Sequence, residues 1–186
     1  MFVEKSITFF TILLFIFRFF APGHALPTLG TSKSLEDVLT NINAVADSYV
    51  IFHGSIQKYH GGPESLSTLQ LQESIVEDHL TDSIDAAAGC PPLDDTGSKQ
   101  IMTALGKPYP TFMSELLGNI TEKKPIFERN SAKPAVLEWL RRLRRLSNEL
   151  PDALERITVD SDSKEIEKGV EWSNTLFGMA LDAYKA

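Results

Sequence analysis

Apolar residues recur at alternating spacings of three and four between residues 34 and 59 of the chain. This spacing places side chains on one face of an α-helix. The residues that share this face are Leu35, Val38, Ile42, Val45, Tyr49, Phe52, Ile56 and Tyr59. Ser34 and Asp37 form a capping-box pattern at the start, and a His-Gly-Gly-Pro sequence follows the end. We therefore predict one long helix whose apolar side must be covered by other helices.

Five further stretches have helical spacing, and glycine and proline residues separate them. None of them shows the sustained period-two alternation of a half-buried strand. They cover residues 64–88, 93–106, 111–124, 131–159 and 161–184. The sequence therefore predicts an all-α fold, a bundle of five or six mostly antiparallel helices with short connections.

The first 25 residues have the pattern of a signal peptide. Lys5 precedes a dense apolar run, and the small residues Gly23 and Ala25 predict cleavage after Ala25. The alternative is a retained membrane anchor, but Arg18 interrupts the apolar run. We expect residues 1–25 to be removed and residues 26–186 to form a single secreted domain without a transmembrane anchor.

Charge and cysteine content limit the partners of this domain. The chain carries a net charge of −7, which disfavours nucleic acid as a partner. The one cysteine, Cys90, has no intrachain partner, so it is either buried or open to intermolecular pairing. Asn119 begins the only Asn-x-Ser/Thr sequence and is a predicted glycosylation site.

The stretch from residue 135 to 157 combines leucines with arginines. On a helix, Val136, Leu140, Leu143, Leu150 and Leu154 fall within an arc of about 100°. The four arginines, residues 141, 142, 144 and 145, point away from it and are expected to form a solvated face, with Glu138 pairing with Arg142. The alternative is a helix that lies on a membrane surface. Pro151 is expected to bend this helix and leave room for an internal apolar cavity.

Residues for catalysis or metal binding are sparse. The histidines after residue 25 are His53, His60 and His79, and none belongs to a Glu-x-x-His or His-Glu-x-x-His pattern. We therefore expect no catalytic residue, metal or cofactor. Ser147 and Ser173 lie on apolar seams, where each hydroxyl either bonds its own helix or anchors a polar group in an apolar pocket.

The order and spacing of several short motifs resemble one family. The motifs are "YHGG" from Tyr59, "PPL" from Pro91, "LLGNITEKKPIF" from Leu116 and the run from Val136 to Leu154. Together they resemble the fungal hydrophobic surface binding protein A family, which includes cell wall galactomannoproteins. The resemblance implies a secreted, helical, non-enzymatic domain that adsorbs to hydrophobic surfaces and can recruit secreted hydrolases. Related domains hold a long-chain fatty acid between helices. The chain differs from the family in Pro151 and in its arginine-rich face. It also lacks a Ser/Thr-rich stalk, and this absence argues against covalent attachment to the cell wall.

The resulting hypothesis is a secreted binding module for hydrophobic surfaces or long-chain lipids, found outside the cell or at the cell wall. One alternative is a structural mannoprotein without a ligand, and another is an enzyme whose site the sequence does not reveal. The candidate lipid-binding residues lie on the seams of three helices expected to share one interior. They are Val45, Tyr49, Phe52, Leu143, Ser147, Val170, Ser173 and Phe177.

Overall fold

The computed structural model describes residues 32–108 and 111–185, and every regular element in these ranges is an α-helix. The predicted signal peptide, residues 1–25, lies outside the described residues. The four long helices are α1 (Leu35–Lys58), α2 (Pro63–Gly89), α6 (Lys133–Glu155) and α7 (Asp160–Lys185). The three short ones are α3 (Asp95–Leu105), α4 (Phe112–Glu122) and α5 (Lys124–Arg129). The predicted all-α bundle is confirmed.

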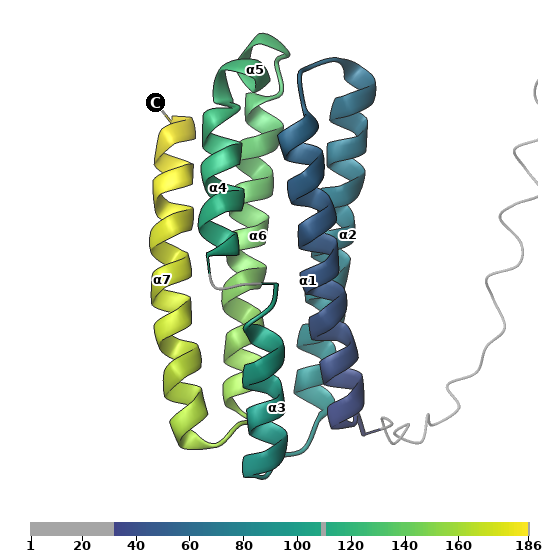
Figure 1. Ribbon diagram of the computed structural model, residues 1–186, viewed down its shortest axis with the longest axis vertical. Helices are drawn as coiled ribbons and strands as arrows, with labels where there is room; N and C mark the ends of the chain where they lie inside the picture. Colours follow the sequence, from purple (N-terminus) through teal and green to yellow (C-terminus); the bar gives the residue numbers. More distant parts are fainter. Residues whose placement is uncertain (1–31, 109–110, 186) are drawn as a thin grey trace, which may run out of the picture. The chain divides into compact units, whose positions relative to one another are not determined.

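Figure 1 shows α1 and α2 as one antiparallel pair and α6 and α7 as another. The two pairs meet where α2 packs on α6, and α4 and α3 close the other side by contacting both α1 and α7. In Figure 1, α3 covers the lower half of that side and α4 the upper half. Two short helices thus occupy one of five positions around the bundle. No helix in the described part of the chain combines the length and apolar character needed to cross a membrane.

The predicted count of five or six helices is wrong, because the described residues form seven. The additional helix is α5, which begins at Lys124 directly after α4 ends. Pro125 was expected only to interrupt a helix, but it lies in the first turn of α5. A proline fits there because the first residues of a helix have no intrahelical partner for their N–H groups.

Local sequence signals explain both ends of α1. The predicted capping box is confirmed, since the Ser34 hydroxyl accepts from the Asp37 N–H at 3.2 Å and the Asp37 carboxylate accepts from the Ser34 N–H at 2.8 Å. After α1, Gly61 and Gly62 have φ values of 104° and 98°, which favour glycine. A Cβ atom on Gly61 would lie 2.6 Å from the Asn130 side chain, so this turn also needs glycine for space.

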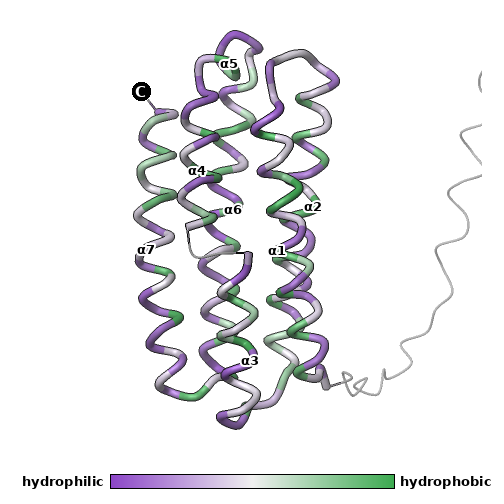
Figure 2. Tube along the Cα trace, viewed as in Figure 1, coloured by the Kyte–Doolittle hydropathy of each residue, from purple (hydrophilic) through white to green (hydrophobic). Residues whose placement is uncertain are grey.

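The core is formed by the apolar faces that the spacing predicted. Figure 2 shows hydrophobic and hydrophilic residues alternating along each long helix, as in amphipathic helices that share an interior. Leu140, Leu143 and Leu154 of α6 are buried, which confirms the leucine face. Near α5, the Tyr59 and Phe127 rings stack with centroids 4.6 Å apart. Cys90 is also buried, one of the two states that the sequence left open.

Pro151 neither ends α6 nor separates it into two helices. The helix continues from Lys133 to Glu155 with Pro151 inside it. Because proline has no N–H, the carbonyl of Ser147, four residues earlier, receives no helical hydrogen bond from it. The backbone carbonyl of the candidate residue Ser147 therefore lacks its usual helical donor within α6.

We predict that Leu143→Ala lowers the free energy of unfolding by about 2 to 5 kcal/mol, because Leu143 is buried and its truncation leaves a cavity. Leu71→Ala is the matched control, because Leu71 is exposed on α2, and its cost should stay within about 0.5 kcal/mol. Urea denaturation followed by circular dichroism measures both. Equal losses in the two variants would contradict the orientation of α6.

Candidate functional site

The first candidate site lies where the middles of α1 and α6 face the start of α4. The Tyr49 hydroxyl lies 3.4 Å from the Ser147 hydroxyl, at hydrogen-bond distance across the interior. The Phe112 ring, at the first residue of α4, stands edge-on to the Tyr49 ring at 6.4 Å. Burial raises the pKa of Tyr49 to about 12, so this phenol is a neutral hydrogen-bond donor at physiological pH. The site combines one polar pair with an apolar, aromatic surrounding.

A polar network joins α6 to α7 at the same level as Ser147. The Arg144 Nε donates to the Asn174 side-chain oxygen at 2.9 Å, and the Asn174 amide donates to the Asn148 side-chain oxygen at 2.8 Å. Ser173 is next to Asn174 on α7 and is half-buried, and it has no hydrogen-bond partner among the described residues. Its hydroxyl therefore does not use the carbonyl of its own helix, unlike the Thr175 hydroxyl, which donates to the Glu171 carbonyl.

The eight candidate residues fall into two groups by burial. Five are buried in the core, and three are half-buried although they lie on faces that otherwise point inward. The buried ones are Val45, Tyr49, Phe52, Leu143 and Phe177. The half-buried ones are Ser147, Val170 and Ser173. The structure joins Tyr49 to Ser147 by a direct contact, whereas no hydrogen bond links Ser173 to that pair within the described chain.

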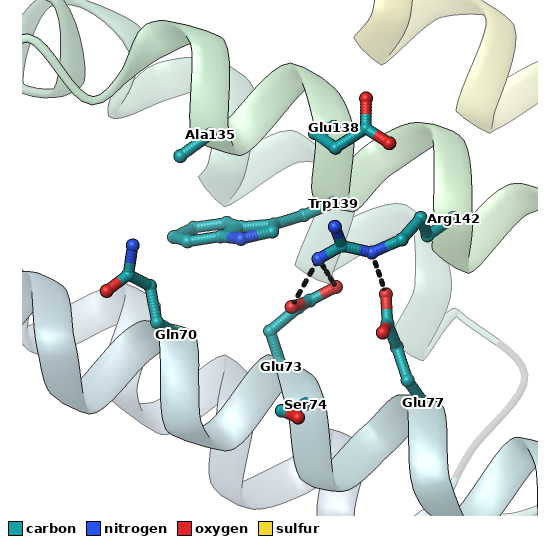
Figure 3. Close-up of a pocket in the computed structure, with 8 residues that line it drawn as sticks. All are labelled: Gln70, Glu73, Ser74, Glu77, Ala135, Glu138, Trp139 and Arg142. Atoms are coloured by element: carbon teal, nitrogen blue, oxygen red, sulfur yellow. Dashed lines mark hydrogen bonds and ion pairs between the residues drawn. The ribbon is translucent and has the colours of Figure 1, made fainter. Parts of the chain in front are cut away.

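The second candidate site is a groove of about 360 Å³ between α2 and α6, drawn in Figure 3. Its main feature is Arg142, which lies between Glu73 and Glu77. The Arg142 Nη2 donates to both Glu73 oxygens at 3.0 and 3.1 Å, and its Nε donates to Glu77. The Trp139 ring lies beside Gln70 in the same groove. These ion pairs link α6 to α2.

Two of the four arginines are therefore not part of a solvated face, and that prediction is wrong for them. Arg142 pairs with α2 and Arg144 with Asn174 of α7, because both lie at the borders of the apolar face. Arg141 and Arg145 are exposed as expected. The predicted partner of Glu138 was Arg142, but Glu138 pairs with Arg141 at 3.7 Å.

Sequence reasoning missed Glu73, which is only 2% exposed. A signal was present, because Glu73 lies at helical spacing between Leu69 and Val76, on the apolar seam of α2. Burial, followed by the hydrogen bond and the charge of Glu77, raises the pKa of Glu73 to about 8, against the opposing charge of Arg142. The folded protein thus retains a proton on this buried carboxyl group to higher pH than the unfolded chain does.

A third depression lies between α4 and α7 and also has a volume of about 360 Å³. Leu117 and Gly118 of α4 and Leu176, Met179 and Ala180 of α7 contribute to its lining. Unlike the groove between α2 and α6, this one has no ion pair among its lining residues.

The predicted glycosylation site, Asn119, lies within α4 and is half-buried. Its side-chain nitrogen donates to the Glu115 carbonyl at 2.9 Å and lies 2.9 Å from the His53 Nε2. Burial lowers the pKa of His53, so its ring is neutral at pH 7 and Nε2 can accept from Asn119. A glycan on this nitrogen would replace one of the two hydrogen bonds, and glycosylation of Asn119 stays a prediction.

No group of three or more histidine, cysteine, aspartate or glutamate side chains within 32–108 and 111–185 is arranged to hold a metal ion. His53 pairs with amides, and His79 Nδ1 lies 3.1 Å from the Ala44 carbonyl oxygen. The first candidate site consists of hydroxyl groups and apolar surface, and the second contains the Arg142 ion pairs.

The helical bundle and its apolar interior define a small all-α domain. The family model described as "Hydrophobic surface binding protein A" matches residues 35–156. The chain therefore belongs to the hydrophobic surface binding protein A family, which confirms the resemblance seen in the sequence. The matched range covers α1 to α6 and ends before α7. No curated protein matches the chain by sequence.

Three solved structures share the fold over nearly their whole length. AfMP4p in complex with palmitic acid has a TM-score of 0.78 and 19% identity, and the match covers 81% of this chain and 99% of that one. Ligand-binding domain 2 of the Penicillium marneffei MP1 protein, complexed with multiple arachidonic acids, has a TM-score of 0.73 and 14% identity over 83% of this chain and 97% of that one. Domain 1 of the same protein, complexed with arachidonic acids, has a TM-score of 0.67 and 14% identity, and the match covers 80% of this chain and 95% of that one.

We predict that the stability of the protein falls as pH rises from about 5 to about 8, because the unfolded chain releases the Glu73 proton near its ordinary pKa of 4.5 whereas the folded protein holds it. The expected loss is about 1 to 3 kcal/mol, and it should level off above pH 8. Glu73→Gln should remove this slope, because glutamine does not titrate. Glu149→Gln, in the exposed pair with Arg145, is the control and should retain it. Urea denaturation at several pH values decides, and an unchanged slope in Glu73→Gln would contradict the assignment.

Proposed function

We propose that the chain is a secreted, non-enzymatic binding module that holds a long-chain fatty acid or a related lipid between its helices. The observation that carries this proposal is the partial exposure of Ser147, Val170 and Ser173 on inward-pointing faces of α6 and α7. Residues on the same faces a turn away, such as Leu143 and Phe177, are buried. We infer from this partial exposure that a ligand can reach the interior at this level.

The solved relatives support this proposal. All three structures described above are complexes with a long-chain fatty acid, and the match covers 95% or more of each of their chains. Residues 1–25 supply the predicted signal peptide, which supports secretion. Adsorption to hydrophobic surfaces, retention at the cell wall and recruitment of secreted hydrolases are further expectations from the family.

In the proposed site, the apolar tail and the polar head of the ligand use different residues. Val45, Phe52, Leu143, Val170 and Phe177 would contact the tail. The Tyr49, Ser147 and Ser173 hydroxyls would donate hydrogen bonds to a carboxylate head. Tyr49 suits this role because its raised pKa keeps the phenol protonated. Each such hydrogen bond contributes about 0.5 to 1.5 kcal/mol, so the tail supplies most of the affinity.

We predict that affinity for saturated fatty acids rises with chain length by about 0.8 kcal/mol per methylene until the interior is full. Isothermal titration calorimetry of delipidated protein with acids of increasing length measures this. Native mass spectrometry of the secreted protein would show a co-purified lipid directly. If folded protein binds no acid of any length, the lipid proposal is wrong and a structural mannoprotein without a ligand is favoured.

Ser173→Leu tests the site itself, because it fills the proposed pocket without removing a hydrogen bond from the described structure. It should weaken binding of the longest acids most, since these use the full interior. Ser65→Leu is the matched control, because Ser65 is an exposed helical serine on α2 whose hydroxyl also has no hydrogen-bond partner among the described residues. Equal binding by wild type and Ser173→Leu would remove Ser173 from the site while leaving the lipid proposal in place.

A further inference from the structure

Helix α7 presents large apolar side chains to solvent on the side next to α4. Trp172 is 44% exposed and Met179 is 67% exposed. With the partly buried Leu176 between them, these residues are spaced by four and three, so they lie on one face of α7. Single exposed apolar side chains are common on protein surfaces, but two exposed ones joined by a half-buried leucine along one face form an apolar strip.

The strip continues into the groove between α4 and α7. Leu176 and Met179 line that groove from α7, and Leu117 and Gly118 line it from α4. A Cβ atom added to Gly118 would meet nothing within 4 Å, so the α4 side of the groove is open. We call Leu117, Gly118, Trp172, Leu176 and Met179 the α4–α7 apolar face.

Charged residues are missing from both helical stretches that form this face. In a chain of which 23% is charged, none of the ten residues from Trp172 to Leu181 carries a charge, and neither does any residue from Leu116 to Thr121. Charges appear only at the ends of these stretches, as Glu171 and Asp182 on α7 and Glu115 and Glu122 on α4. The charged residue in the lining of the groove is Glu122, at the end of α4, so an anionic headgroup or a nucleic acid would gain no favourable ionic contact here. The rest of the face suits an uncharged apolar partner.

We propose that the α4–α7 apolar face is the surface by which this protein adsorbs to an extended hydrocarbon surface. The proposal rests on the adsorption expected from the family, and it does not depend on the lipid held inside the bundle. A second copy of the chain fits less well, because stable protein interfaces use about 20 to 30 residues a side. A narrow strip of three large side chains is much smaller, whereas a hydrocarbon surface requires no matching shape.

The test compares two double variants that each replace two exposed apolar residues with glutamine. Trp172→Gln with Met179→Gln changes the α4–α7 apolar face. Ile51→Gln with Leu71→Gln is the matched control, because these residues are exposed to a similar extent on α1 and α2. Circular dichroism and thermal melting first establish that both variants are folded. Adsorption is then measured with a quartz crystal microbalance on octadecyl-coated silica and on bare silica.

The α7 variant should need about tenfold more protein for half coverage of the octadecyl surface, because adsorption then buries less apolar area. The control variant should match wild type, and neither variant should differ from wild type on bare silica. Equal losses in the two variants, or no loss in either, would overturn the proposal.

Two further measurements separate this proposal from its alternatives. Fatty-acid titration of the α7 variant should match wild type, so a failure of lipid binding and a failure of adsorption can be distinguished. Light scattering on a sizing column gives the oligomeric state. A wild-type dimer that becomes a monomer in the α7 variant would assign the face to a second copy of the chain and overturn adsorption as its role.

Discussion

Two prolines only two residues apart, Pro108 and Pro110, strongly disfavour a continuous helix, and the shape of the proposed site depends on this constraint. One position of the bundle is filled by two short helices, α3 and α4, instead of one long helix. Phe112, the first residue of α4, packs edge-on against Tyr49, which pairs with Ser147. The start of α4 is therefore level with the polar pair, and the half-buried inward positions of α6 and α7 lie at this same level. The break between α3 and α4 therefore lies at the level where we propose that a ligand enters.

Charge is placed at the borders of the helices and not in the proposed pocket. Arg142 pairs with Glu73 and Glu77 between α6 and α2, and Arg144 bonds Asn174 between α6 and α7. A buried ion pair contributes little net stability, but removing one partner leaves an uncompensated charge. These contacts therefore fix which helices are neighbours. They leave the interior around Tyr49 and Ser147 with neutral hydroxyl groups, which suit a carboxylate head on an apolar chain.

Sequence patterns predicted what depends on local spacing. The seam of α1, its capping box and the leucine face of α6 all follow from residues within a few turns of one another. The sequence could not assign partners across the bundle, so Arg142 and Arg144 were expected in solvent and Glu73 was missed. Helix α5 was missed because a proline such as Pro125 can either interrupt a helix or lie in the first turn of one. Only the surrounding packing distinguishes these two roles. For the site, the eight candidates were chosen by helix face. Tertiary structure adds which of them touch, as Tyr49 and Ser147 do, and which keep access to solvent.

Helix α7 has a different role from the rest of the bundle. The family model matches residues 35–156, which hold α1 to α6, whereas the solved structures match 80–83% of the chain. Helix α7 adds Val170, Ser173 and Phe177 to the proposed interior and Trp172 and Met179 to the outer apolar face. Opposite sides of one helix thus serve two kinds of apolar contact, one with a single chain and one with an extended surface. Because Trp172 and Met179 are exposed whereas Phe177 is buried, substitutions at the exposed positions of α7 can change one contact without altering the other. The two proposed activities are therefore physically separable on the same helix.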